Sequence, residues 1–432
     1  MVILRFTSRI CFAPASLAAR LRRARAGSSA GSGKRVCRPD FTHHARTFVA
    51  VVALCGIFAA GAREAAAYPQ FQFSSGTSRC NQCHFAPAGG GLINGWGRDE
   101  AGDTLSRGGN GAFLHGAWDP PSWLALGADI RLAALVNDVQ DPEPARPIFF
   151  PMQGDLYARL ALGDAWSVSL TGGLRGVARP TRTPTLAERL RGGPDLTSRL
   201  VSREHFVMWR PKTNGPYARA GRFFAPFGLR LVEHPAYVRR YMGFNVLEEP
   251  YAASGGVVKD DWELHVTGFV PNFVNAVGSQ GYGGAAYLER RPGDATAVAG
   301  QAMVSVTDAD TRMTAGVVGK HYFEDAKLLL MAEVDGVWQR FPDADGASRV
   351  QLVTYLGATF FPTKGLLAAA ILEHYDEDVA IADVDRDAAS VQINFFPRAH
   401  FELVLLGRVQ TIGLGNGGPT SLLGMFQLHY YL

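Results

Sequence analysis

The sequence has 432 residues, of which 47% are hydrophobic, so it is long enough for one large β architecture or about two or three ordinary domains. Its formal charge of +4 comes from the N-terminus, because residues 1–67 hold 11 of the 43 basic and only 2 of the 39 acidic side chains. The remainder carries 32 basic and 37 acidic side chains, a net charge of −5. This balance removes the main electrostatic argument for a nucleic-acid partner, and we expect none.

Residues 1–67 have the organisation of a secretory signal peptide. An arginine-rich stretch precedes the uncharged run from Phe48 to Ala62, and three alanines end at Ala67. A basic region, an apolar region and small residues at the end are typical of a cleaved signal, and the apolar run is too short for a spanning helix. We expect cleavage near Ala67–Tyr68, with a long basic n-region whose true translation start stays open. The mature chain then keeps two cysteines, Cys80 and Cys83.

Residues 68–122 are rich in glycine and poor in long apolar runs, so they contain too little material for an independent core. They carry Cys80, Cys83 and His84 in the pattern Cys-x-x-Cys-His. Two thiols at this spacing form thioethers with the vinyl groups of a haem, and the adjacent histidine ligates the iron as the proximal ligand. A small disulfide loop or part of a zinc site are the alternatives, although zinc needs two more ligands. We therefore predict one covalent haem c on these three residues.

The sixth ligand of such a haem is undetermined. Between His84 and Met152 the one side chain of the usual type is His115, which is the candidate distal ligand and gives a bis-histidine haem of lower potential. A five-coordinate iron or a ligand from the barrel wall are the alternatives. Four aromatic residues are expected to cover the faces of the haem, to anchor the segment, or both: Phe71, Phe73, Phe85 and Trp96.

From Trp123 to the C-terminus, segments of about ten residues alternate apolar with small or polar side chains. In residues 390–395, Val391, Ile393 and Phe395 alternate with polar neighbours. This period of two is typical of β-strands that present two different faces. Sixteen such segments are expected, near 123–139, 148–164, 166–179, 202–211, 217–228, 241–258, 262–273, 281–291, 296–309, 311–323, 326–341, 347–362, 365–376, 388–397, 400–412 and 421–432.

The connections between these segments alternate in length. Every second one is tight, as at 163–165 and 260–261, while most of the others are longer, as at 180–201 and 377–387. Short turns on one side and long loops on the other are typical of an outer-membrane barrel with its short side in the periplasm. We therefore predict an all-β fold, an antiparallel transmembrane barrel of about 16 strands over residues 123–432, in contact with outer-membrane lipid. A secreted β-sandwich or β-solenoid is the alternative.

This order of features resembles the fused monohaem cytochrome–porins of the bacterial outer membrane, whose best-known members are the outer-membrane cytochromes of iron-oxidising bacteria. The segment 219–230, RAGRFFAPFGLR, also resembles a strand-to-loop passage of porins. In specific residues the likeness rests on the haem motif and its surroundings: Cys80, Cys83, His84, Leu92, Asn94, Trp96, Gly97 and Arg98. The resemblance implies haem on the two cysteines, His84 on the iron, and electron passage across the outer membrane.

The main functional hypothesis is an electron conduit between an extracellular partner, with Fe(II) as one option, and a periplasmic c-type cytochrome. Such a protein transfers electrons and makes no substrate bonds, although Fe(II) oxidation stays open. The alternative is a solute porin whose segment 68–122 is a plug or redox sensor. We expect this segment to enter the lumen from the periplasmic side. An acidic loop at 373–387 and four arginines are further candidates for ion binding: Arg222, Arg230, Arg239 and Arg240.

Overall fold

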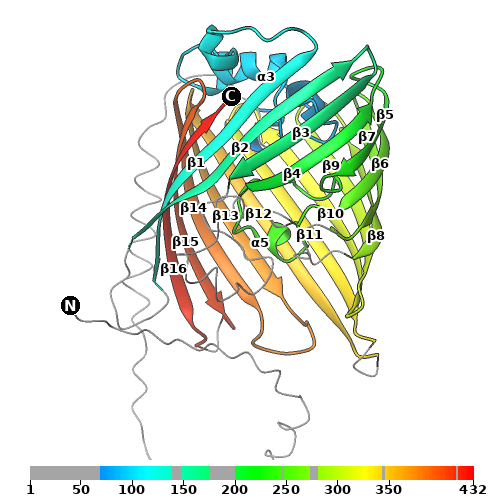
Figure 1. The fold of residues 1–432 in the computed structure, drawn as a ribbon. Helices are drawn as coiled ribbons and strands as arrows, with labels where there is room; N and C mark the ends of the chain where they lie inside the picture. The colour runs from blue at the N-terminus through cyan, green and yellow to red at the C-terminus, as the bar shows by residue number, and fades with distance from the viewer. Residues whose placement is uncertain are drawn as a thin grey trace, which may run out of the picture. The chain divides into compact units, whose positions relative to one another are not determined.

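Sixteen antiparallel strands close into one barrel in the computed structural model, as the sequence predicts (Figure 1). The structure describes seven ranges, and every structural statement concerns them: 69–138, 147–174, 200–244, 248–272, 281–342, 346–414 and 417–432. The predicted signal peptide lies outside these ranges. Each strand pairs with its neighbours in the chain, and the ring is closed where β1 pairs with β16. No helix in these ranges has the length and apolar character needed to cross a membrane.

The strand bounds follow the predicted segments closely, apart from the two at the β5–β6 connection. The strands are β1 (Leu124–Asp138), β2 (Ile148–Leu162), β3 (Trp166–Leu174), β4 (Leu200–Trp209), β5 (Pro216–Arg222), β6 (Tyr251–Val258), β7 (Trp262–Val270), β8 (Tyr282–Arg290), β9 (Thr296–Val306), β10 (Thr311–Phe323), β11 (Leu328–Arg340), β12 (Ser348–Thr363), β13 (Leu366–Asp376), β14 (Arg386–Arg398), β15 (Phe401–Ile412) and β16 (Thr420–Tyr431).

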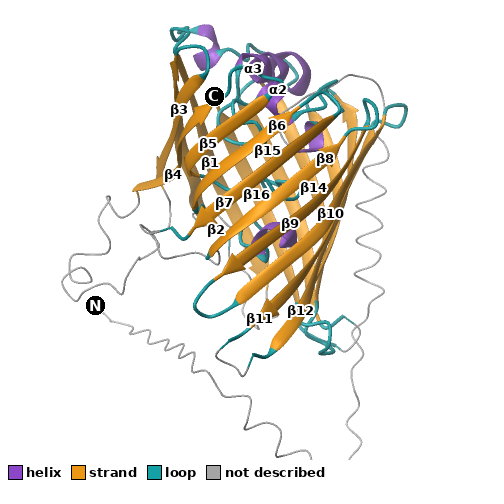
Figure 2. Ribbon diagram, turned by 90° about the vertical axis from the view of Figure 1, so that its right-hand side faces the viewer, coloured by secondary structure: helices purple, strands orange, loops and turns teal. Residues whose placement is uncertain are grey.

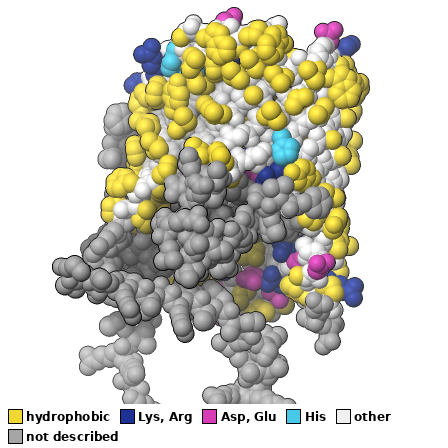
Figure 3. Space-filling model, viewed as in Figure 1, with side chains coloured by type: hydrophobic (Ala, Val, Ile, Leu, Met, Phe, Trp, Pro, Cys, Tyr) yellow, Lys and Arg dark blue, Asp and Glu magenta, His cyan; other side chains and the backbone are white. Residues whose placement is uncertain are grey.

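The two faces of the wall have opposite chemistry. Apolar side chains such as Leu156, Val317 and Leu405 point outward and are more than half exposed, whereas polar ones such as Gln392 and Glu402 point inward and are buried. Hydrophobic side chains therefore spread over the outer face of the barrel (Figure 3). A water-facing sandwich would place its apolar side chains between two sheets. An outward apolar belt around a polar interior is instead the pattern of a barrel that sits in lipid.

The connection between β5 and β6 corrects the predicted strands at 217–228 and 241–258. β5 ends at Arg222 and β6 begins at Tyr251, and residues 223–244 of the connection fold into the lumen, where they form the short helix α5 (Tyr237–Arg240; Figure 1). We call residues 223–244 the inward loop. Its apolar side chains are buried inside the barrel, not against lipid, and the alternating sequence does not distinguish these two forms of burial.

The described part of the N-terminal segment, residues 69–122, lies at the short-turn end of the barrel in the same compact unit (Figure 2). Asn81 donates to the carbonyl of Thr213 in the β4–β5 turn at 2.7 Å, and the amide of Ala399 donates to the carbonyl of Gly108 at 2.8 Å. The segment is therefore tied to several turns of the barrel rim. Its helical turns are η2 (Pro69–Phe71), α2 (Cys80–Cys83), α3 (Gly95–Glu100), η3 (Ala101–Leu105) and η4 (Phe113–Gly116).

Candidate functional site

The Cys-x-x-Cys-His motif forms a single helical turn. Cys80 and Cys83 stand at the two ends of α2, and the amide of His84 donates to the carbonyl of Cys80 at 3.1 Å. The side-chain oxygen of Gln82 accepts from the amides of Ser78 and Arg79, each at 3.0 Å, and so satisfies donors at the start of the turn. The two cysteines and the histidine are thus held next to one another by local hydrogen bonds.

A second turn fixes the first from behind. The side chain of Asn94 accepts from the backbone amide of Gly97 and donates to the carbonyl of Gln82, both at 2.9 Å. The backbone amide of Asn94 donates to the carbonyl of Cys83. Gly97 packs directly on Cys83, where a Cβ atom would overlap the carbonyl. Two of the residues that carry the resemblance, Asn94 and Gly97, therefore support the geometry of the cysteine turn.

Three glycines form the other side of the site. Gly89, Gly90 and Gly91 all adopt positive φ angles of 80°, 80° and 60°, which side chains with a Cβ atom rarely adopt. A Cβ atom on Gly89 would lie 2.9 Å from the Cβ atom of Cys80. This close approach requires glycine, and it brings the backbone over the first cysteine and His84.

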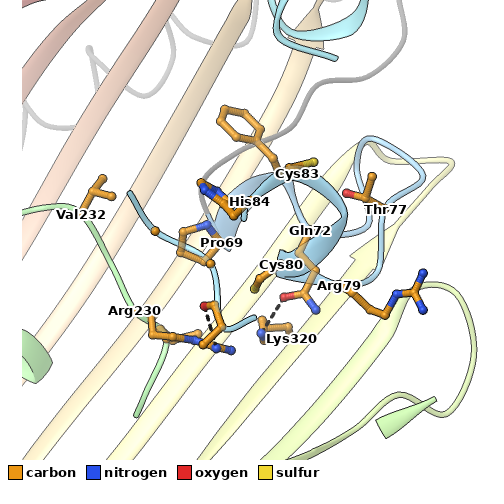
Figure 4. Close-up of a pocket in the computed structure, with 15 residues that line it drawn as sticks. Pro69, Gln72, Thr77, Arg79, Cys80, Cys83, His84, Arg230, Val232 and Lys320 are labelled. Carbon is orange, nitrogen blue, oxygen red and sulfur yellow. Dashed lines mark hydrogen bonds between the residues drawn. The ribbon is translucent and has the colours of Figure 1, made fainter. Parts of the chain in front are cut away.

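Cys80, Cys83 and His84 line one cavity of about 580 Å³ between the segment and the barrel interior. Figure 4 shows the cysteine turn next to Arg230, from the inward loop, and Lys320, from β10. Five apolar residues also line the cavity: Pro69, Phe71, Ala88, Leu229 and Val232.

Both cysteines are free thiols in the structure. Burial raises the pKa of Cys83 to about 12 and also raises the pKa of Cys80, although the positive charge of Arg230 opposes the second shift. Both thiols are therefore protonated at neutral pH. Two neutral thiols and an imidazole on one largely apolar cavity fit the donor set of a c-type haem.

A charge network joins the segment, the inward loop and the wall beside this cavity. Arg230 donates to the carbonyl of Ala88 at 2.9 Å and pairs with Glu263 on β7 at 3.4 Å. The Lys320 ammonium donates to the side chain of Gln72 at 2.6 Å and to Glu289 on β8 at 2.9 Å. Sequence reasoning missed Gln72 and Lys320, because they are 248 residues apart and no local pattern joins them.

His115 lies elsewhere on the rim. It belongs to η4, and its ring packs edge-on against the ring of His400 at 4.5 Å and near Tyr430 at 6.5 Å. It is not among the residues that line the cavity of Cys80 and His84. The structure therefore does not bring His115, the candidate distal ligand, to the cavity of His84, the candidate proximal ligand. Distal ligation of a haem iron by His115 stays a prediction.

The four aromatic residues have different positions. Phe71 lines the cavity and packs on Phe396 of β14 at 6.0 Å, so it anchors the segment, and its covering of a haem stays a prediction. Phe73 is buried in the core, and Phe85 lies under the guanidinium of Arg159 at 4.5 Å, as anchors do. Trp96 is 56% exposed.

The acidic loop brings three possible metal ligands together at the long-loop end. Ligand atoms of His374, Asp385 and Asp387 all lie within 4.8 Å of one another, and His374 pairs with Asp387 at 3.0 Å. Of the four arginines, Arg222 at the end of β5 pairs with Glu249, just before β6, at 3.2 Å. Arg230 and Arg239 line cavities, and the guanidinium of Arg240 lies over the ring of Tyr241.

Comparisons with known proteins give information on the fold of the barrel. No family model and no curated protein matches the chain. Among solved structures, the anion-selective porin from Comamonas acidovorans aligns over 72% of this chain and 99% of its own, with a TM-score of 0.53 at 11% identity. Outer-membrane expressed OmpT of Vibrio cholerae aligns over 72% and 97%, with a TM-score of 0.53 at 9% identity. OprB of Pseudomonas putida aligns over 72% and 94%, with a TM-score of 0.51 at 11% identity.

At these identities the likeness shows the fold. The chain has the barrel fold of outer-membrane porins, which confirms the predicted fold class and the porin half of the expected resemblance. The cytochrome half, with its haem, stays a prediction.

Proposed function

We propose that this chain is an outer-membrane electron conduit, a porin-type barrel whose N-terminal segment carries one covalent haem c. The observation that carries the proposal is the convergence of Cys80, Cys83 and His84 on one cavity at the junction of segment and lumen. When bound, the haem supplies a one-electron Fe(II)/Fe(III) couple. The two thiols hold it, His84 ligates the iron, and the apolar lining excludes water.

The position of this cavity supports the conduit over a free periplasmic haem domain. The apolar band of an outer-membrane barrel is about 25 Å tall, and a single haem is smaller than that. Gln72, eight residues before Cys80, reaches Lys320 and Glu289 on the lumen wall. A haem held here is set into the barrel, where a periplasmic c-type cytochrome and an extracellular donor or acceptor are the expected partners.

A visible spectrum tests the proposal. The protein is expressed with a cytochrome c maturation system, purified from outer membranes, and recorded while Fe(II) or dithionite is added. We expect covalent c-type haem in the wild type and none in Cys80→Ser/Cys83→Ser, with His84→Ala keeping covalent haem but changing its ligand-field spectrum. Prompt reduction by Fe(II) supports iron as a substrate, while reduction by dithionite alone points to another partner. Absence of covalent haem from the wild type overturns the proposal.

The second candidate is a solute porin in which the segment is a plug. A cavity of about 1120 Å³ on the loop side of the glycines favours it, as does the fold shared with a porin described as anion-selective. The conductance of the protein in a planar lipid bilayer distinguishes the solute porin from the electron conduit. An open channel of the wild type without haem supports the porin, and a closed barrel with haem supports the conduit.

A further inference from the structure

One turn of the N-terminal segment lies against the outer face of the barrel, whereas the cysteine turn faces the lumen. The ring of His115, in η4, is nearly parallel to the ring of Phe401, at a centroid distance of 6.4 Å, and lies 6.5 Å from the ring of Tyr430. Phe401 and Tyr430 are cross-strand partners at the short-turn ends of β15 and β16, with ring centroids 4.9 Å apart. The turn η4 therefore packs on two neighbouring strands of the wall.

Phe401 and Tyr430 belong to the lipid-facing side of these strands. Side chains alternate along a strand, so Phe401 shares its face with Leu405, and Tyr430 shares its face with Phe426. Leu405 and Phe426 are exposed on the outer surface, whereas Glu402, next to Phe401, is buried in the lumen. The histidine ring of η4 thus covers two outward rings at the barrel rim.

Arg107 makes a second contact with the outer face. Its guanidinium lies over the ring of Phe395 at 5.9 Å, and its backbone amide donates to the carbonyl of Phe396 at 3.0 Å. Phe395 points outward, because it alternates with the buried polar side chains of β14. Arg107 and Arg398, the last residue of β14, are both exposed. The segment therefore reaches the outer rim along β14, β15 and β16, where two cationic side chains are accessible.

Two large apolar side chains next to this contact are exposed. Leu114 is 39% exposed and Trp118 is 46% exposed. The ring of Phe113 is buried under the guanidinium of Arg98, and it packs edge-on against the indole of Trp118 at 5.8 Å. Trp118 is thus fixed by packing on one side and accessible on the other. An exposed leucine and tryptophan beside outward-facing rings extend the apolar surface of the rim.

The backbone of η4 holds Leu114 in an unfavourable conformation. Leu114 and His115 have positive φ angles of 49° and 58°, which residues with a Cβ atom rarely adopt. Hydrogen bonds fix this turn: a ring nitrogen of His400 donates to the carbonyl of Ala112 at 3.0 Å, and the side chain of Asn110 accepts from the amide of Ala112 at 2.8 Å. Strain of this kind persists where the surroundings impose it, and it is concentrated at functional sites.

We propose that Leu114 and Trp118 anchor the segment in the headgroup region of the periplasmic leaflet of the membrane. These two side chains continue the lipid-facing surface of the barrel, since their turn packs on outward rings at the strand ends. Tryptophan prefers this interface because its ring is apolar and its N–H group finds polar partners there. Arg107 and Arg398, on the same stretch of rim, suit lipid phosphates because their stems are apolar and their ends are charged.

Other strands place large rings at the same end of the wall. Trp166 and Phe323 are exposed and point outward at the short-turn ends of β3 and β10. Trp118 adds to this aromatic girdle from a segment that is not part of the wall. The proposed anchor does not depend on haem. A periplasmic protein is the competing occupant, and it requires Trp118 to stay in water.

Fluorescence quenching tests the lipid contact in the exported protein made without haem, because haem itself quenches tryptophan. The protein is placed in nanodiscs of phosphatidylethanolamine and phosphatidylglycerol, with lipids brominated near the headgroup or near the methyl end of the chains. The difference between wild type and Trp118→Phe isolates the signal of Trp118, and Trp166→Phe gives the reference for a wall tryptophan. We expect Trp118 to be quenched about as strongly as Trp166, and more by bromine near the headgroup. No quenching of Trp118 by either lipid overturns the proposal and leaves the surface to a protein partner.

Trypsin cleavage after Arg107 tests the anchoring effect. Leu114→Asn keeps a residue that tolerates positive φ and removes the apolar side chain. Cleavage should be about fivefold faster than in the wild type in the nanodiscs, and unchanged or slower in lipid-free amphipol. Ala117→Asn is the matched control, because it introduces the same side chain at an exposed position of the same turn. Equal cleavage of Leu114→Asn and wild type in nanodiscs, or the same increase in amphipol, contradicts the anchor.

Discussion

The barrel wall and the N-terminal segment are stabilised in different ways. The wall is a continuous ladder of sixteen strands, in which each strand is paired on both sides. The segment contains helical turns of three to six residues, which are too short to be stable alone, and it is ordered by contacts with the rim. The wall therefore depends on its own strand pairing, whereas the segment depends on its contacts with the wall.

The largest expected effect separates the two regions altogether. A chain without residues 69–122 should still fold into a barrel, because none of its strand pairs includes the segment. The isolated segment should show no stable helix or tertiary structure by circular dichroism. Heat-modifiable migration in SDS gels monitors the barrel. A folded isolated segment, or a truncated barrel that does not assemble, would contradict the claim that the wall folds without the segment and the segment does not fold without the wall.

The second effect concerns the thiols in protein made without haem. Because burial raises the pKa of Cys83 to about 12, its thiolate fraction at pH 8 is about a thousandfold below that of a thiol with a pKa of 9. Alkylation by iodoacetamide should therefore be far slower in the folded than in the unfolded protein. Its rate should keep rising with pH above 9, whereas the unfolded control levels off there. Fast alkylation of the folded protein at pH 8 would show that the site is open.

The third effect concerns close packing inside the segment. Gly97→Ala places a Cβ atom against Cys83, so we expect a loss of about 2 kcal/mol in the local stability of the segment. Trypsin cleavage of the segment should then be roughly thirtyfold faster, while the barrel stays resistant. Gly95→Ala is the matched control in the same helix, because no atom lies within 4 Å of the added Cβ. Equal cleavage of both variants would contradict the packing argument.

The smallest effect concerns one cap. Asn94→Ala removes the acceptor for the amide of Gly97 and the donor to Gln82, and should lower local stability by about 1 kcal/mol. The same trypsin assay should report a rate about fivefold higher. Asn94→Asp keeps the acceptor and loses the donor, so its rate should lie between the other two. A rate of Asn94→Asp equal to that of Asn94→Ala would assign the effect to the donor alone.

The sequence predicts the wall well because lipid and lumen impose opposite chemistry on alternate residues. It fails at the inward loop, since apolar side chains such as Phe223 and Leu229 are buried inside the barrel and not in lipid. In the candidate site, Cys80, Cys83 and His84 are local neighbours and were found by spacing alone. The charge of Arg230 makes it a candidate, but its contacts with the segment depend on barrel closure, which no local sequence pattern predicts.

The pairing of the first strand with the last constrains the order of assembly. The ring closes only after β16 has been synthesised and exported, and the amide of Leu432, which follows β16, donates to the carbonyl of Ala128 in β1 at 2.9 Å. By then Cys83 is 4% exposed. Any enzyme that modifies Cys83 therefore has to act on the exported chain before the segment folds onto the barrel rim. During biogenesis, the maturation of residues 69–122 would then have to be complete before the barrel that follows them is inserted.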